Sequence, residues 1–333
     1  MKKILLVRTD RIGDVVLSLP AAAMIKGSLP GVQVHFLTRG YTAPLAAMSS
    51  EVDEVVVDEG GNFLALSRRL RGQGYDAAVL LHPELRLALA LWLAAIPIRV
   101  GTAYRAYSPF FNRKVPLHRR SSLRHELELN LELVSQGLGL AMEEGRLSRF
   151  VPMLRLDRKK QEELQKSLGW QQGRTIILHP GSGGSARDWP LSHFSLLASL
   201  LLSRGYRVAV SLGPDEDRIR DGFHGSLAGR IHWLQGLDLG LLATAISLSR
   251  LMVANSTGPL HLATAVGTKA LGLYCPIKPC RPQRWGPYGP GHRALLPEVP
   301  GCDKCLGSRC RYWDCMSTIT VDRVLENIEE MLS

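Results

Sequence analysis

The sequence predicts an α/β protein with two doubly wound parallel sheets, and three observations lead to this prediction. Short apolar runs alternate with longer segments of helical periodicity along the chain. The runs are continuously apolar, which is typical of strands buried on both faces of a parallel sheet. The chain has 333 residues, a length that usually exceeds what one hydrophobic core serves, so two domains are expected.

Eight apolar runs bounded by turn residues are expected to be strands. In the first half they are KILLV (3–7), QVHFLT (33–38), EVVVD (54–58) and DAAVLLH (76–82). In the second half they are TIILHP (175–180), YRVAVSLG (206–213), RLMVANS (250–256) and KALGLYC (269–275). Helical segments such as 191–204 and 239–249 lie between them, and this order favours a doubly wound sheet in each half.

The domain boundary is expected where this alternation pauses. Between about residues 146 and 173 the sequence indicates a link followed by one amphipathic helix. We therefore expect domains over residues 1–155 and 156–333. A C-terminal helix over residues 320–333 is expected to pack back towards the first domain.

The charge of the chain is strongly positive and unevenly distributed. The formal net charge is +11, and the segment from Arg68 to Arg124 holds eleven Arg and Lys against only Asp76 and Glu84. Such a stretch indicates a polyanionic partner (nucleic acid, anionic lipid or a phosphorylated substrate), with a solvated basic face as the alternative. No apolar run approaches the roughly 20 residues of a membrane span. Charged residues follow the N-terminal apolar run at once, so a cytoplasmic protein is expected.

Several common nucleotide and hydrolase fingerprints are missing from the sequence. The first strand–helix turn, VRTDRIGD, holds one glycine where a dinucleotide-binding fingerprint needs three. No Walker pattern occurs, and HPGSGGSA does not have the spacing of a nucleophile elbow. The dehydrogenase, P-loop and serine-hydrolase classes are therefore disfavoured.

Polar residues follow four of the expected strands, at the edge where ligands of open α/β sheets gather. In RTDRIGDVVLSLP, Gly13 allows a tight turn and Asp14 begins the next helix, as a helix cap or as a weak base. In HPGSGGSARDWP, glycines, Ser182 and Arg187 suit a phosphate. In VSLGPDEDR, Asp215 suits the two hydroxyls of a ribose, again with a helix cap as the alternative.

The fourth strand end, in NSTGPLHLATAVG, is expected to open a helix whose first amides bind an anion. The residues concerned are Ser256, Thr257 and Gly258, with His261 one turn further along. Together these features predict a nucleoside diphosphate held by the second domain and a carboxylate supplied by the first.

These motifs, in this order and over nearly the whole chain, resemble glycosyltransferase family 9, the bacterial heptosyltransferases. The resemblance rests on KILLVRTDRIGDVVLSLPAA, HPGSGGSARDWP, NSTGPLHLATAVGTKALGLY and RWGPYG. It implies a GT-B fold, in which two Rossmann-like domains face each other across a cleft. The acceptor is then expected on the first domain and the nucleotide sugar on the second.

The resemblance also implies roles for individual residues. Asp14 matches the general base, Arg187 the basic residue at the donor phosphates, and Asp215 the acid at the ribose. Ser182 matches a hydroxyl of the phosphate loop, Gly183 stands where a second hydroxyl occurs, and Leu237 falls near the base-contacting position by a count across a gap. Family members often have Asp-Thr-Gly where this chain has Ser256, Thr257 and Gly258, and this difference leaves the donor sugar open.

The expected function is inverting, metal-independent transfer of a heptose from ADP-heptose to the inner core of lipopolysaccharide. Another nucleotide sugar or acceptor within the family is the alternative. Basic residues are expected to meet the acidic core sugars on lipid A and the anionic cytoplasmic face of the inner membrane, and no nucleic-acid partner is expected. The residues proposed for the acceptor are Arg11, Arg113, Arg119, Arg120 and Arg124.

Four cysteines near the end of the chain form the pattern C-x2-C-x4-C-x4-C, namely Cys302, Cys305, Cys310 and Cys315. Four thiolates at this spacing suit a structural zinc ion, and reduced packed thiols are the alternative. Cys275 and Cys280 are expected only to pack. Catalysis itself is expected to need no cofactor. Two rival functions remain, a sugar-nucleotide epimerase and a noncatalytic nucleic-acid-binding protein.

Overall fold

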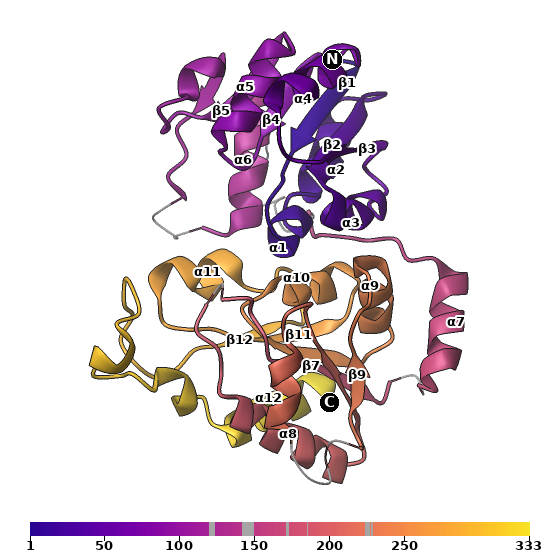
Figure 1. Cartoon of the computed structure of the whole chain (residues 1–333), viewed down its shortest axis with the longest axis vertical. Coiled ribbons are helices and arrows are strands. Elements are labelled where there is room, and N and C mark those ends of the chain that lie inside the picture. Colours follow the sequence, from indigo (N-terminus) through magenta and orange to yellow (C-terminus); the bar gives the residue numbers. More distant parts are fainter. Residues whose placement is uncertain (120–123, 142–149, 171–172, 185, 224–226, 228) are drawn as a thin grey trace. The chain divides into compact units, whose positions relative to one another are not determined.

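The computed structural model describes residues 1–119, 124–141, 150–170, 173–184, 186–223, 227 and 229–333. The chain divides into two compact units, Met1–Arg155 and Leu156–Ser333. Each unit is a parallel sheet with helices on its faces (Figure 1). The predicted α/β class with two doubly wound sheets is therefore confirmed.

The first unit has six parallel strands in the order β3-β2-β1-β4-β5-β6. The strands are β1 (Lys3–Val7), β2 (Gln33–Arg39), β3 (Glu54–Asp58), β4 (Ala77–Leu80), β5 (Ile98–Thr102) and β6 (Arg113–Val115). The helices are α1 (Ile12–Val16), α2 (Pro20–Ser28), α3 (Ala43–Ala47), α4 (Phe63–Arg71), α5 (Leu85–Leu93) and α6 (Glu126–Leu138). The strand order reverses between β1 and β4, so a ligand crevice is expected where these two strands end.

The second unit repeats this topology with the order β12-β11-β10-β7-β8-β9. Its strands are β7 (Thr175–His179), β8 (Arg207–Ser211), β9 (His232–Leu234), β10 (Leu251–Asn255), β11 (Lys269–Leu273) and β12 (Arg293–Leu295). Its helices are α7 (Arg158–Leu168), α8 (Leu191–Ser203), α9 (Leu239–Ser247), α10 (Gly258–Ala265), α11 (Pro282–Trp285) and α12 (Val321–Leu332). Here the order reverses between β7 and β10.

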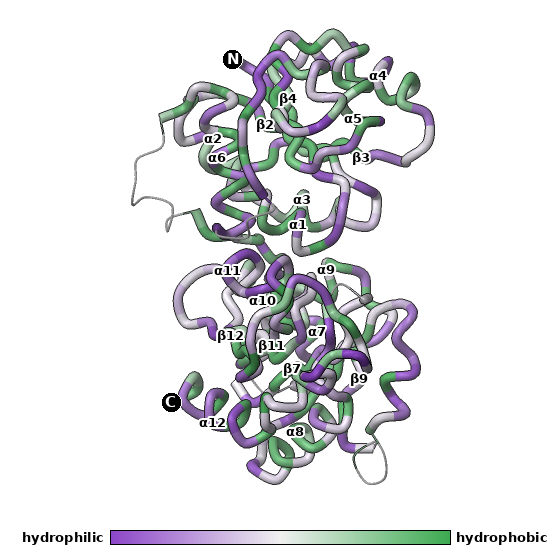
Figure 2. Tube along the Cα trace, turned by 90° about the vertical axis from the view of Figure 1, so that its left-hand side faces the viewer, coloured by the Kyte–Doolittle hydropathy of each residue, from purple (hydrophilic) through white to green (hydrophobic). Residues whose placement is uncertain are grey.

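The central strands are buried on both faces, as their continuous apolar runs predict. Every residue of β7 and β10 is buried, and Figure 2 shows hydrophobic residues concentrated on the strands of both sheets. All eight predicted strands are present. Sequence patterns missed β5, β6, β9 and β12, because three of these strands have only three residues and three of the four contain Arg or Lys.

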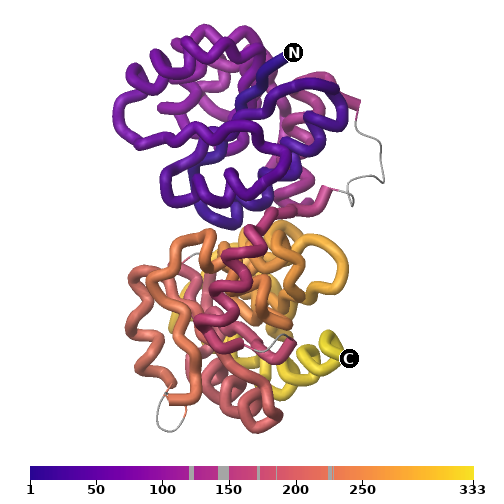
Figure 3. The backbone as a smooth tube through the Cα atoms, turned by 90° about the vertical axis from the view of Figure 1, so that its right-hand side faces the viewer, coloured from indigo at the N-terminus to yellow at the C-terminus, as the bar shows by residue number. Residues whose placement is uncertain are grey.

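The C-terminal helix lies in the core of the second unit. Val324 and Ile328 of α12 are fully buried with residues of α8 and of the second sheet, and Figure 3 shows the yellow C-terminal segment lying against other segments of the second unit. Arg250, directly before β10, and Lys269, the first residue of β11, donate to the carbonyls of the helix's last turn. The apolar face of α12 is therefore used within its own unit.

Candidate functional site

The turn after β1 carries the candidate base. Helix α1 is preceded by Arg11 as its N-terminal cap residue, and no side chain caps the helix by a hydrogen bond. Asp14 lies in the first turn with 15% of its side chain exposed, and its carboxylate accepts a hydrogen bond from Arg8. The helix-cap interpretation of Asp14 is therefore wrong, and its carboxylate belongs to an ionic group instead.

Arg8 is the centre of that ionic group. Its guanidinium is 3% exposed, and its Nε lies 2.7 Å from an oxygen of Asp10. Its Nη1 lies 3.2 Å from Glu126, which opens α6. Glu126 also pairs with Arg119, and Asp10 lies 3.0 Å from Nδ1 of His82.

The charges around Asp14 change how strongly it holds a proton. Burial of the carboxyl, together with the negative charges of Asp10 and Glu126, raises the pKa of Asp14, and Arg8 offsets only part of that rise. Burial would also raise the pKa of Asp10, but Arg8 and His82 hold it below its ordinary value. Asp14 is thus the more basic of the two aspartates.

The glycine-rich turn after β7 is held in place by one buried side chain. Asn255, at the end of β10, donates to the carbonyl of Pro180 at 2.5 Å and accepts from the backbone amide of Trp189 at 2.9 Å. Between these two anchors, Gly183 and Gly184 adopt positive φ angles of 56° and 72°, which favour glycine.

The turn after β10 lies beside this loop. β7 and β10 pair in parallel with Ala254 opposite His179, so both turns leave the same edge of the sheet. Thr257 is the N-terminal cap residue of α10 and makes no side-chain capping bond, while Gly258 begins the helix. Ser182, Ser256 and His261 are all buried at this edge. Helix amides and the glycine-rich loop are therefore brought together, as an anion site requires.

The acid that reaches the glycine-rich loop is Glu216, one residue after the predicted Asp215. Asp215 is exposed. The carboxylate of Glu216 accepts from the amide of Gly213 at 2.7 Å, and a Cβ atom at Gly181 would collide with it. Leu237 is half-buried and lies two residues before the start of α9. Sequence spacing alone does not distinguish two adjacent acids after a strand.

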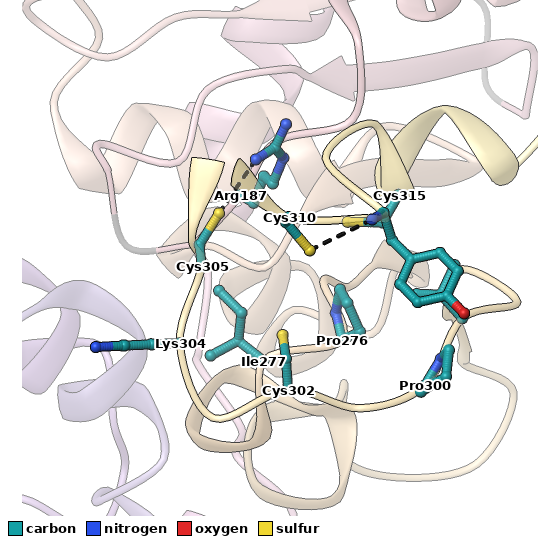
Figure 4. A pocket seen from close by; sticks show the side chains of 11 residues that line it. Arg187, Pro276, Ile277, Pro300, Cys302, Lys304, Cys305, Cys310 and Cys315 are labelled. Atoms are coloured by element: carbon teal, nitrogen blue, oxygen red, sulfur yellow. Dashed lines mark hydrogen bonds between the residues drawn. The ribbon is translucent and has the colours of Figure 1, made fainter. Parts of the chain in front are cut away.

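Arg187 contacts the cysteine-containing segment in this structure. One terminal nitrogen of its guanidinium lies 3.1 Å from Sγ of Cys305 (Figure 4). The other donates to the carbonyl of Trp313. Arg187, which was predicted to bind a phosphate, thus contacts residues that the sequence analysis placed outside the donor site.

The four cysteines of the C-x2-C-x4-C-x4-C pattern line one cavity of about 40 Å³ together with Arg187. The sulfurs of Cys305 and Cys310 each accept an amide hydrogen bond at 3.4 Å, from Gly307 and Tyr312. Thiol donors suit zinc. Within the described ranges, however, no three His, Cys, Asp or Glu side chains are arranged to hold a metal ion. The tetrathiolate geometry predicted from the spacing is therefore not formed here.

The basic residues expected at the acceptor differ in their surroundings. Arg11 and Arg113 are exposed. Arg119 pairs with Glu126, and Arg124 pairs with a glutamate of α6. Arg120 lies outside the described residues. Part of the basic stripe is thus neutralised within the first unit.

Two units of one topology, each with polar residues at its switch point, define an α/β protein with a GT-B-like fold. Residues 63–315 match the family model of glycosyltransferase family 9 (heptosyltransferase), and the chain belongs to this family. It is a glycosyltransferase, so the noncatalytic alternative does not hold. Among the described helices, none has the length and apolarity that crossing a membrane requires.

Similar proteins cover almost the entire chain. A putative glycosyltransferase of Haemophilus influenzae is 29% identical over 302 residues, which are 86% of this chain and 86% of that protein. Lipopolysaccharide heptosyltransferase 1 of Pseudomonas aeruginosa is 24% identical, covering 99% of this chain and 98% of that protein. The structure of E. coli ADP-heptose lipopolysaccharide heptosyltransferase II has a TM-score of 0.81 at 21% identity, covering 100% and 98%.

Proposed function

We propose that this glycosyltransferase moves a heptose from ADP-heptose to the inner core of lipopolysaccharide, with inversion at the anomeric carbon and without a catalytic metal. The observation that carries the proposal is the partly buried Asp14 carboxylate at the switch point of the first unit, whose environment favours proton uptake. The names of the similar heptosyltransferases support the donor and the acceptor.

In the proposed reaction, Asp14 takes the proton of an acceptor hydroxyl while that oxygen attacks the anomeric carbon. The attack comes from the face opposite the nucleotide, the bond from carbon to the phosphate oxygen breaks, and ADP leaves with the electron pair. A carboxylate with a raised pKa is a better general base than an ordinary aspartate, because its affinity for the proton is higher.

The leaving diphosphate needs positive charge or aimed dipoles. In the proposal, the amides of Thr257 and Gly258 at the start of α10 bind it together with the glycine-rich loop. Arg187 then exchanges its contacts with Cys305 and Trp313 for the phosphate oxygens, which its planar fork suits. These groups stabilise the leaving charge by themselves.

The acceptor in this proposal is a lipid-linked oligosaccharide with acidic sugars at the cytoplasmic face of the inner membrane. The exposed Arg11 and Arg113 are available for such anions. Each basic side chain near an anionic membrane surface contributes roughly 1 kcal/mol to binding. We therefore propose a peripheral, salt-sensitive association with that surface.

The test is single-turnover transfer by Asp14→Asn with ADP-heptose and a truncated core acceptor. We expect a fall on the order of 10²-fold or more, because the base is lost, while ADP still stabilises the variant in a thermal-shift assay. Transfer within a few-fold of the unchanged protein would remove Asp14 as the base. Because Ser256 stands where family members often have an aspartate, the same assay is run with other ADP- and UDP-linked sugars.

A further inference from the structure

One guanidinium serves three carboxylates beside the candidate base. Arg8, at the end of β1, contacts Asp10, Asp14 and Glu126. Glu126 is 1% exposed and has a second cation in Arg119. Asp10 has a second partner in His82. Asp14 makes its ion pair with Arg8 alone among the residues that the structure describes.

The charges do not balance in this group. Among the described residues, two guanidinium groups, those of Arg8 and Arg119, make ion pairs with three carboxylates, so one proton is more easily held here than in isolated carboxyl groups. Of the three carboxylates, Asp14 makes the fewest ion pairs within the part of the chain that the structure describes. The charged and titratable groups around it come from the β1–α1 turn, the end of β2 and the segment after it, the segment after β4, the segment before α6 and the start of α6. They are Arg8, Asp10, Arg11, Arg39, Tyr41, His82, Arg119 and Glu126.

A buried amide fixes this arrangement in space. Oδ1 of Asn130 accepts from Arg8 at 3.4 Å and from Arg119 at 3.0 Å. Its Nδ2 donates to the carbonyl of Leu17 at 3.2 Å and to Oγ of Ser18 at 3.1 Å. Ser18 in turn donates to the carbonyl of Asp14 at 2.7 Å. Helix α6 and the α1 turn are thus held to each other through Asn130.

We propose that Glu126, acting through the shared guanidinium of Arg8, is a positioning residue that sets how strongly Asp14 holds a proton. Glu126 occupies part of the hydrogen-bonding capacity of Arg8 and adds a negative charge nearby, so the Asp14 carboxylate is only partly neutralised. Asp14 therefore accepts the acceptor's proton more readily than an aspartate with an arginine of its own. This inference rests on the proposed role of Asp14.

The sign of the expected effect follows from these contacts. Glu126→Gln removes one negative charge and leaves Arg8 more available to Asp14, which lowers the pKa of Asp14. The acid limb of kcat/KM against pH then moves to lower pH, by roughly one unit. Arg8→Lys has the opposite effect, because an ammonium cannot serve three carboxylates as a planar fork does. Glu126→Asp keeps the charge and is expected to keep the limb near its original pH.

The experiment combines pH–rate profiles of the full chain with a ¹³C-carboxyl titration of aspartate-labelled protein. The Asp14 resonance is assigned by its loss in Asp14→Asn. Asp58→Asn serves as the control, because Asp58 is also an ion-paired aspartate of the first unit, with 2% of its side chain exposed, but its partner is Arg86. The pH–rate profile of Asp58→Asn, and the Asp14 resonance measured in that variant, are expected to match those of the unchanged protein.

The two readouts separate the inference from the proposed function. Opposite shifts of the Asp14 resonance in Glu126→Gln and Arg8→Lys support the inference even if no transfer is detected. An unmoved resonance and an unmoved acid limb in both folded variants overturn it, even where Asp14→Asn abolishes transfer. Normal transfer by Asp14→Asn overturns the proposed function instead.

Discussion

Replacing Asn255 by alanine should disorganise the turn that is proposed to bind the donor. Asn255 is fully buried at the end of β10 and joins the two ends of the glycine-rich loop, at Pro180 and Trp189. Alanine removes both hydrogen bonds and leaves a buried carbonyl and a buried amide without them. Each such unsatisfied group destabilises a fold by about 1–3 kcal/mol, so a loss of about 2–6 kcal/mol in the free energy of unfolding is expected.

The assay is urea unfolding followed by tryptophan fluorescence, together with calorimetric titration of ADP. Five of the six tryptophans belong to the second unit, so the fluorescence reports mainly on the unit that contains Asn255. Calorimetry is run at urea-free conditions where the variant is still folded. ADP binding is expected to weaken at least tenfold, because the loop no longer holds one geometry.

A matched control is Asn327→Ala. Asn327 lies on α12 of the same unit and accepts from Arg293, but it is only partly buried. Its replacement is expected to lower the free energy of unfolding by about 1 kcal/mol or less, since water replaces the lost partner. A loss below 1 kcal/mol for Asn255→Ala, or equal losses for both variants, would refute the argument that Asn255 holds the loop.

Two further predictions concern the neighbourhood of that loop. Gly181→Ala pushes the carboxylate of Glu216 away from the amide of Gly213, so urea unfolding should show a loss of about 1 kcal/mol, the contribution of one hydrogen bond, and ADP should bind more weakly. Gly229→Ala, which meets nothing within 4 Å, is the control, and equal behaviour of the two variants contradicts the reasoning. Hydrogen bonds from the Gly307 amide and from Arg187 lower the pKa of the exposed Cys305. Iodoacetamide should therefore label Cys305 first among the six cysteines, and Arg187→Met should slow that labelling. Peptide mapping that finds Cys275 labelled first would contradict this prediction.

The repeated topology explains why both candidate sites lie where they do. In each unit the strand order reverses beside the first strand of that unit, β1 or β7. Neighbouring connections there leave towards opposite faces of the sheet, which opens a crevice at the strand ends. The polar turns 8–14, 181–189 and 255–258 follow strands at these two places. The polar turns singled out in the sequence therefore lie at the strand ends where each sheet is expected to bind a ligand.

Some site residues could be predicted because they are local in sequence. Asp14 follows Gly13 directly after a strand, and Ser256, Thr257 and Gly258 open a helix, so propensity and turn chemistry suffice to place them. Arg8 and Asp10 stand in the same opening stretch, but no spacing rule marks them as partners of a carboxylate. The one feature of the sequence that indicates a role for Arg8 and Asp10 is their position close to Asp14 along the chain.

The amino-acid sequence by itself determined eight of the twelve strands that the structure describes, the doubly wound class and the turns that carry Asp14 and the glycine-rich loop, because burial patterns and turn residues act over a few neighbouring positions. Only the tertiary structure decided which side chains meet. In the folded chain Arg8 contacts Glu126, which lies 118 residues away, and Arg187 contacts Cys305. Glu216, rather than Asp215, contacts the glycine-rich loop, and α12 packs in the core of the second unit. Charge pairing and side-chain packing depend on distances in space, and those distances arise only when the sheet brings remote strand ends together.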